Sequence, residues 1–405
     1  MKRLFLLFVP AVFALFIGCS SRTSSELIII GLKESYPKLE MPIQELANVE
    51  YIPLETGDRF LLTDSPQLFY ADDEYIMMTD RATDHEGRVV PAIFIYDRSG
   101  RAINMINRRG NGPGEYLSLS NPAYDPSTKE IFFHDRQRSS IFVYDVAGRF
   151  IRQLAIQGDA REGVEAIKIW DISNLIIYTP YPLSPSYEGA ENFFKTASII
   201  SKQDGSTVKE IDIKFEKRLQ AVGNAPYPNG TGMGTIITLL FSLQRSGEDF
   251  LLSEISADTI FRLSRDMKLA PAAVRRPSVA KNDETLFLQA IHETPRYFFT
   301  YILDMGHIED MVKGPNVKYL ICDKKEDKIY DLALYNDDYT ARTPFTISRQ
   351  SFSDIAPAGS TYLMIDAYAL VRDNKEGKLR GRLKEIADTL KEDDNPVLMI
   401  AIFRE

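Results

Sequence analysis

The feature that most constrains the fold of this chain is an internal repeat. Residues 93–106 (IFIYDRSGRAINMI) align without a gap on residues 141–154 (IFVYDVAGRFIRQL), 48 positions later, and seven of the fourteen positions are identical. Each copy has an apolar run, a turn that ends on glycine (Gly100 or Gly148) and a second run. Aspartate and glycine favour such turns, because the carboxylate bonds nearby backbone and glycine tolerates positive φ. The pattern predicts a β-hairpin that occurs at least twice.

Related strand-like runs occur along the rest of the chain. These runs lie at 74–80, 130–135, 167–171, 175–178, 249–254, 259–269, 318–323, 328–332 and 362–366. Several of the runs end on an acidic residue. Together they form about six units, a number of copies typical of radially repeated small sheets. We therefore predict an all-β fold, a six-bladed β-propeller with four-stranded antiparallel blades. The average unit is about sixty residues, longer than the ~40–50 of common propeller repeats, which predicts loop insertions. Two candidates are the proline-containing loop 179–195 and the glycine-rich loop 222–235.

Two stretches have a helical rather than a β pattern. Residues 283–293 are partly apolar and predict a short helix. A second, C-terminal helix is predicted because four apolar side chains share one helix face: Leu379, Leu383, Ile386 and Leu390. Residues 397–403 then form a last apolar strand. We hypothesise that this strand pairs with a strand at 49–54, since such pairing removes the free edges of an open ring.

The N-terminus has the composition of a targeting segment. Residues 1–3 (MKR) are basic, and residues 4–17 are uncharged and mostly apolar. Fourteen residues are fewer than the roughly 20 needed to cross a bilayer as a helix, but they suit the core of a secretory signal. The chain then divides into a signal peptide (1–18), a serine-rich tether (19–35) and a propeller (36–405).

The charge balance excludes one class of partner. The chain has 48 Lys+Arg against 57 Asp+Glu, a formal charge of −9, which becomes −11 once Lys2 and Arg3 are removed with the signal (−9 − 2). Binding to nucleic acid depends on clustered basic residues that neutralise phosphates, so a nucleic-acid partner is not expected. Two cysteines, Cys19 and Cys322, allow at most one bridge, so disulfides are not expected to hold the fold.

Several motifs together resemble a known family. Phe-Ile-Gly-Cys at 16–19 resembles the bacterial lipobox, in which a small residue precedes a cysteine that takes diacylglycerol. Further segments resemble the bacterial six-bladed β-propeller lipoproteins with NHL-like repeats; they are 51–56, 109–116, 131–135, 141–145, 148–151 and 392–400. The resemblance implies lipidation at Cys19, a membrane anchor in the cell envelope and a binding role, but no agreed catalytic residues. No acidic residue directly follows Cys19, which favours the periplasmic side of the outer membrane over the cell surface.

The sequence offers few candidate ligand contacts. Arg108 and Arg109 flank a glycine-rich segment, 110–114, which we interpret as a tight crossover between blades because Walker and dinucleotide signatures are missing. These arginines are either ligand contacts at the channel mouth or solvated surface charges. Tyr181 and Tyr187 lie in the first insertion, where aromatic rings either stack on sugar or peptide or pack within the loop.

The sequence shows no legible catalytic or metal motif. The four histidines are not spaced as ligands, and no Gly-x-Ser-x-Gly elbow occurs. We expect no cofactor and no metal, and a non-enzymatic binding or scaffolding module for a glycan, peptide or envelope protein. The alternative is a propeller hydrolase or lyase whose residues converge at the channel mouth from several blades.

Overall fold

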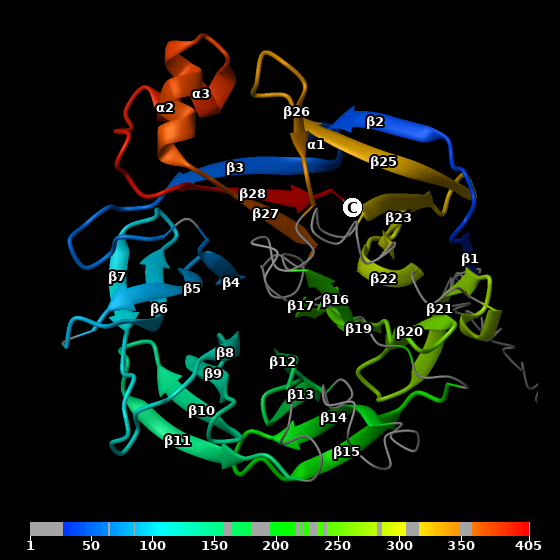
Figure 1. The fold of residues 1–405 in the computed structure, drawn as a ribbon, viewed down its shortest axis with the longest axis horizontal. Coiled ribbons are helices and arrows are strands. Elements are labelled where there is room, and N and C mark those ends of the chain that lie inside the picture. The colour runs from blue at the N-terminus through cyan, green and yellow to red at the C-terminus, as the bar shows by residue number, and fades with distance from the viewer. Residues whose placement is uncertain are drawn as a thin grey trace, which may run out of the picture.

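The protein is a six-bladed β-propeller, as the repeats predict (Figure 1). The computed structural model describes residues 27–404, apart from 64, 85, 158–163, 180–194, 216–218, 220–221, 227–232, 238–240, 282–285, 305–315 and 348–358. Six sheets stand around a central channel, each with its first strand innermost.

The first three blades are four-stranded antiparallel sheets in sequence order. Blade 1 contains β4 (Gln67–Ala71), β5 (Tyr75–Thr83), β6 (Val89–Asp97) and β7 (Ala102–Ile106). Blade 2 contains β8 (Ser120–Asp125), β9 (Glu130–Asp135), β10 (Ser140–Asp145) and β11 (Phe150–Ala155). Blade 3 contains β12 (Ala166–Ile169), β13 (Asn174–Tyr178), β14 (Lys195–Ser201) and β15 (Thr207–Asp212). The two repeat copies are the hairpins β6–β7 and β10–β11, and Gly100 and Gly148 have positive φ in their turns.

Blades 4 and 5 each gain an outer strand from the N-terminal segment. Blade 4 contains β18 (Leu243–Ser246), β19 (Asp249–Leu252), β20 (Thr259–Leu263) and β21 (Leu269–Arg276), with β1 (Ile28–Gly31) parallel to β21. Blade 5 contains β22 (Leu286–Glu293), β23 (Tyr297–Asp304), β24 (Asn316–Asp323) and β25 (Lys328–Asn336); β2 (Lys38–Pro42) and β26 (Thr343–Phe345) pair with β25. β1 lies inside the stretch 19–35 that the sequence assigns to a tether. Its isoleucines pair with blade 4 and Ile30 is fully buried, so residues 28–31 belong to the propeller.

Blade 6 joins the two ends of the chain and confirms the predicted closure. Its described strands are β27 (Ser360–Ile365), β28 (Val397–Phe403) and β3 (Ala47–Pro53), and a single turn of helix, α1 (Ile43–Leu46), precedes β3. β28 pairs antiparallel with β3 from Val397 opposite Pro53 to Phe403 opposite Ala47. The last strand of the sequence therefore lies between two others, and the ring has no open seam.

The helical predictions are half right. The C-terminal helix exists as α3 (Gly381–Ala387), which contains Leu383 and Ile386 but neither Leu379 nor Leu390 of the predicted face. A second helix, α2 (Ala367–Lys375), precedes it and was not predicted; the Asp366 carboxylate caps α2 by accepting from the Ala369 amide at 2.8 Å. The helix predicted over 283–293 is wrong for its described residues, because 286–293 is strand β22; a 3₁₀ turn, η3 (Val279–Lys281), lies before the predicted range. As the innermost strand of blade 5, β22 is buried on both faces, so its apolar run lacks the alternation of a half-exposed strand.

The core consists of the spaces between neighbouring blades. The described buried residues form six apolar clusters, each uniting residues of two adjacent blades. Aromatic rings fill several of these spaces: Tyr116 meets Phe133 edge-on at 5.2 Å, and Trp170 stacks on Phe250 at 5.6 Å. Because each sheet is covered on both sides, the blades support one another around the ring.

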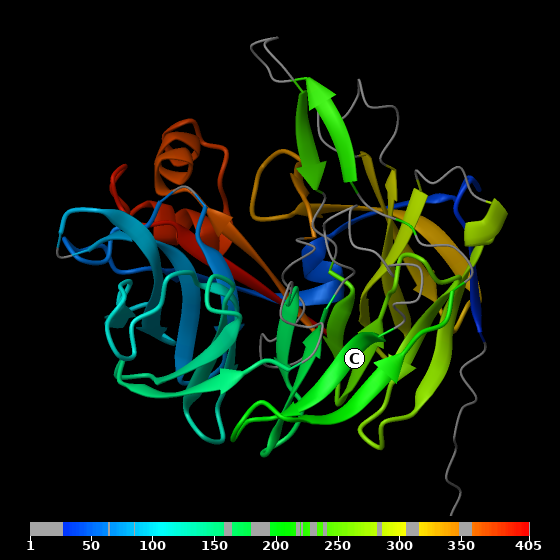
Figure 2. The same cartoon turned by 60° about the horizontal axis from the view of Figure 1, so that its bottom comes forward.

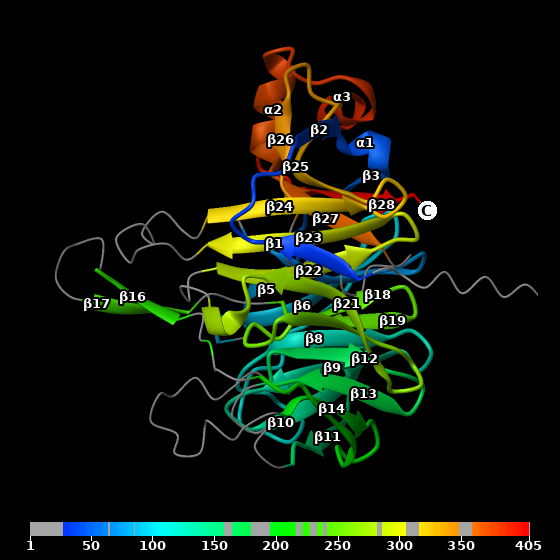
Figure 3. The ribbon, with the colours of Figure 1, turned by 90° about the vertical axis from the view of Figure 1, so that its right-hand side faces the viewer.

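The two faces of the propeller differ. In blades 1 to 5, the turns between first and second strands and between third and fourth strands lie on one face, here called the turn face. Blade-to-blade connections lie on the opposite face, here called the connection face. The connection between β15 and β18 contains a hairpin, β16 (Val222–Pro226) and β17 (Met233–Ile237), which projects away from the ring (Figures 2 and 3). The predicted insertion at 222–235 is therefore real, whereas most of 179–195 lies outside the described residues.

Candidate functional site

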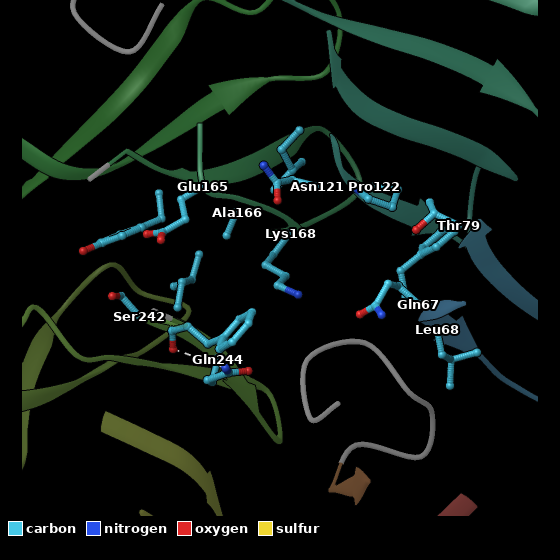
Figure 4. Close-up of a pocket in the computed structure, with 15 residues that line it drawn as sticks. Gln67, Leu68, Thr79, Asn121, Pro122, Glu165, Ala166, Lys168, Ser242 and Gln244 are labelled. Atoms are coloured by element: carbon cyan, nitrogen blue, oxygen red, sulfur yellow. Dashed lines mark hydrogen bonds between the residues drawn. The ribbon is translucent and has the colours of Figure 1, made fainter. Parts of the chain in front are cut away.

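A pocket of about 230 Å³ opens in the channel, and we call it the channel pocket. Its walls come from the connection-face ends of the first strands of blades 1 to 4 (Figure 4). The residues that line it are Gln67, Leu68, Phe69, Thr79, Asn121, Pro122, Glu165, Ala166, Ile167, Lys168, Tyr178, Phe241, Ser242, Leu243 and Gln244. Four blades thus contribute to one site.

Strand pairing places these side chains beside one another. Gln67 of β4 pairs with Thr79 of β5, so blade 1 contributes two polar groups at the same level. Asn121 adopts a positive φ of 51° at a bulge in β8, a conformation that asparagine tolerates better than most residues. Its side-chain amide donates to the Val164 carbonyl at 2.7 Å, which links blade 2 to the start of blade 3. The pocket wall between these two blades is therefore fixed by a hydrogen bond.

The channel pocket contains one basic and one acidic lining side chain. Lys168 belongs to the first strand of blade 3, and only 9% of the residue is exposed. Glu165 lies three residues earlier and is half-buried. Figure 4 shows Glu165 and Ser242 on one side of Lys168, and Gln67 and Thr79 on the other. Lys168 therefore lies between a side with an acidic group and a side with neutral polar groups.

A second carboxylate lies behind the acidic side. The buried Tyr178 hydroxyl donates to Glu254 at 3.0 Å, and the other oxygen of Glu254 accepts from the Ser256 amide at 3.0 Å. Burial, and next the Glu254 and Glu165 carboxylates, raise the pKa of Tyr178 well above its ordinary value. Tyr178 is thus a neutral hydrogen-bonding group that separates two acidic side chains.

The arginines predicted as ligand contacts do not line this pocket. Both lie in the connection between blades 1 and 2, where Arg108 is exposed and Arg109 donates through Nε to the Leu117 carbonyl at 3.2 Å. Gly110 donates to the Tyr116 carbonyl at 2.9 Å, so this segment is the tight crossover that the sequence predicts. A ligand role for the two arginines stays a prediction.

The other predicted site residues, Cys19, Tyr181 and Tyr187, lie outside the described residues. Three residues that line the pocket were not predicted from the sequence: Lys168, Asn121 and Gln244. One signal was present, because Lys168 interrupts the otherwise apolar strand β12 (Ala166–Ile169). A charged residue inside a buried strand is unusual unless it is paired or faces a site.

The described residues show no cluster that could hold a metal ion. No three His, Cys, Asp or Glu side chains within the described ranges come together as metal ligands. The lining set includes one carboxylate, Glu165, and no histidine. A paired-carboxylate or histidine-based mechanism has no complete set of groups among these lining residues.

Comparison with known proteins identifies the family. The profile of the family described as "Domain of unknown function (DUF4934)" matches residues 27–401. The chain belongs to this family. No curated protein sequence matches the chain.

Two solved structures are similar to this DUF4934 chain. A "Putative exported protein" from Bacteroides fragilis NCTC 9343 is 14% identical, with 94% of this chain and 100% of that chain covered at a TM-score of 0.62. A member of the DUF4221 family from Bacteroides vulgatus ATCC 8482 is 11% identical, with 89% and 97% covered at a TM-score of 0.48. At these identities the likeness concerns the fold alone. No helix in the described part of this chain is both long and apolar enough to cross a bilayer.

Proposed function

We propose that this DUF4934 protein is an envelope lipoprotein that binds a small polar ligand in its channel pocket. The observation that supports binding is the convergence of polar side chains from four blades on one pocket. Concave sites with a few convergent polar groups are the usual form of small-molecule sites.

The chain topology supports an orientation for the anchored protein. β1 runs parallel to β21, whose first residue follows the β20–β21 turn on the turn face. Ile28 is opposite Ala273 near the middle of β21, and the N-terminal end of β1 points toward the face opposite the channel pocket. An anchor at Cys19 would be eight residues before Leu27, a reach of at most about 30 Å at ~3.3–3.6 Å per residue. A protein held this way presents its pocket away from the membrane, open to solutes of the periplasm.

Lipidation is tested with Cys19→Ser. In cells fed an alkyne-labelled fatty acid, the wild-type protein should acquire label and sediment with membranes, because two or more acyl chains give stable anchoring. The variant should stay unlabelled and soluble. Membrane association of an unlabelled variant would contradict the anchor.

Ligand binding is tested by closing the pocket with Ala166→Trp. Its matched control is Ala270→Trp, at an exposed position of β21. Dipeptides, monosaccharides and disaccharides are screened by thermal shift and then by calorimetry. At least one compound should bind wild type and the control but not Ala166→Trp. Equal responses of all three proteins to every compound would overturn the assignment of the pocket.

The alternative function, a hydrolase or lyase, is tested with the same proteins and compounds. A compound that binds is incubated with the protein and followed by mass spectrometry. Turnover that Ala166→Trp abolishes would favour the enzyme, and an unchanged compound would favour a binding module.

A further inference from the structure

Two amide side chains of the channel pocket have their oxygens available. Asn121 donates through Nδ2 to the Val164 carbonyl at 2.7 Å, and Gln67 donates through Nε2 to the Ser65 carbonyl at 3.2 Å. Neither Oδ1 of Asn121 nor Oε1 of Gln67 has a hydrogen-bond partner within the described part of the chain. Because the protein already uses a donor of each amide, what both amides offer a ligand is an acceptor.

Two hydroxyl groups line the same pocket. Ser242 is only 2% exposed and lies beside the Tyr178 hydroxyl, yet its Oγ has no hydrogen bond of ordinary length to any described residue. Thr79 is half-buried, and its Oγ1 likewise has no partner among these residues. A buried polar group without a partner is costly, so a ligand that reaches Ser242 can supply a hydrogen bond that the protein does not.

The charged lining groups do not require a charged ligand. Lys168 and Glu165 each have an interaction partner within the protein, and so does Gln244. A cationic ligand would be repelled by the Lys168 ammonium, and an anionic ligand would approach the Glu165 carboxylate. The pocket therefore favours a neutral ligand.

A neutral compound that donates in several directions matches the available oxygens. Hydroxyl groups do so, because each has one donor and can also accept from a serine or threonine hydroxyl. Thr79 lies on one side of Lys168 and Ser242 on the other (Figure 4), so the donors must be spread around the ligand. A sugar ring carries hydroxyl groups around its rim, and its C–H faces suit the lining rings of Phe69 and Phe241.

The volume limits the ligand to one ring. About 230 Å³ is smaller than the ~300–1,000 Å³ typical of pockets for drug-sized ligands. This space suits a monosaccharide rather than an oligosaccharide.

We propose that the channel pocket binds a neutral monosaccharide. Its hydroxyl groups donate to four lining oxygens: Oδ1 of Asn121, Oε1 of Gln67, Oγ1 of Thr79 and Oγ of Ser242. This assignment rests on the proposed function and specifies its ligand class.

The test compares matched sugars on the full-length protein. Binding of glucose, galactose and mannose, of their amino sugars and uronic acids, and of the dipeptide Ala-Leu is measured by calorimetry at slightly acidic pH. At least one neutral hexose should bind. The amino sugar and the uronic acid of the same hexose should bind about tenfold or more weakly, because each brings a charge that must be desolvated without compensation. This comparison needs no variant and is unaffected by any folding defect.

Variants then test individual hydrogen bonds. Thr79→Val and Ser242→Ala each remove a hydroxyl to which no described residue is hydrogen-bonded at ordinary length, so Tm should stay close to that of wild type. Each variant should bind the hexose about fivefold more weakly, the effect of one neutral hydrogen bond. Thr207→Val, at an exposed position on outer strand β15, is the control and should bind like wild type.

The outcomes separate this proposal from the broader one. No binding of any hexose, equal affinity for neutral and charged sugars, or wild-type affinity of both variants would overturn the monosaccharide assignment. The pocket would remain a binding site if Ala166→Trp still abolished binding of another compound, such as Ala-Leu. If no compound binds and Ala166→Trp changes nothing in the wider screen, both proposals fail.

Discussion

At the scale of single residues, the Asp-x-x-Gly-Arg turn occurs three times in blades 1 and 2. Its copies start at Asp84, Asp97 and Asp145, and each carboxylate accepts hydrogen bonds from the amide and from Nε of the arginine four residues later. The glycines of the three turns all have positive φ. The first copy, between β5 and β6, lies outside the aligned repeat, so this turn recurs independently of the rest of the unit.

The equivalent glycines Gly100 and Gly148 should differ in their tolerance of a side chain. Alanine at either position must adopt a left-handed conformation, which costs about 1–2 kcal/mol of folding free energy. At Gly148 a Cβ would meet Asn104 and Ile106 at an ordinary 3.5 Å, whereas at Gly100 it would overlap the carbonyl oxygen of Pro53. We expect Gly148→Ala to cost only the conformational penalty and Gly100→Ala to cost clearly more in urea unfolding. If both variants lose the same free energy of unfolding, the Pro53 carbonyl in blade 6 must move away from the new methyl group without an energetic cost.

The aspartates of these turns predict a pH dependence. Desolvation opposes ionisation of Asp84, but hydrogen bonds from the Arg88 amide and guanidinium and from the Glu86 amide outweigh it and lower the pKa to about 2. Since the unfolded value is ~3.9, this contribution to stability is present above about pH 4 and is lost as the pH falls to about 2. Asp84→Asn should therefore lower Tm at pH 7, and its difference from wild type should vanish near pH 2. Asp393→Asn, at an exposed position, is the control; a constant Tm difference for Asp84→Asn across this range would contradict the argument.

At the scale of elements, blade 6 replaces its fourth strand with a loop. The chain leaves β3 at Pro53 and reaches β4 at Gln67 without forming a strand among the described residues between them. The buried Asn395 holds this loop: its Nδ2 donates to the carbonyls of Glu55 and Phe60, and its Oδ1 accepts from the Leu62 amide at 2.9 Å. One side chain thus supplies bonds that a strand ladder would otherwise make.

Loss of this side chain should be costly. Asn395→Ala leaves three backbone groups without their partner, for which we expect a loss of about 2–3 kcal/mol in unfolding free energy. Asn395→Asp should lose more, because its carboxylate would face two carbonyl oxygens. Asn374→Ala removes an exposed bond to Asp388 and should change stability by less than ~0.5 kcal/mol. If Asn395→Ala unfolds at the same urea concentration as Asn374→Ala, the loop does not depend on this anchor.

At the scale of the whole molecule, the ring depends on a pairing between the two ends of the sequence. β28 lies between β27 and β3, and its residues also belong to the apolar clusters that join blade 6 to blades 5 and 1. Two neighbouring blades therefore lose their packing partner when β28 is absent.

Truncation after Pro396 should abolish single-transition unfolding. The shortened ring exposes the edges of β27 and β3 and the apolar faces of blades 1 and 5, so we expect a broad transition and association at moderate concentration. Removal of Glu405 alone is the control and should leave the urea curve unchanged. A truncated protein that unfolds in one transition at the wild-type midpoint would show that closure is dispensable.

Local patterns in the sequence were sufficient to predict much of the architecture. The recurring runs and the repeat at 93–106 and 141–154 predicted the blades, since strands, turns and glycine conformations depend on neighbouring residues. The apolar strand 397–403 also predicted the closure, because so apolar a terminal strand needs partners. The inner strand β22 was mistaken for a helix, since a strand covered on both faces loses the alternation that identifies it.

The candidate site, unlike the blades, could not be predicted from local sequence patterns. Lys168, Gln67 and Gln244 belong to three blades and are far apart in the sequence, and no local pattern marks them as neighbours. The sequence by itself determined a ring of six small sheets, because each sheet follows from short-range periodicity and turn chemistry. Only the tertiary structure decided which residues face the channel, because that depends on how the twisted blades meet around a common axis.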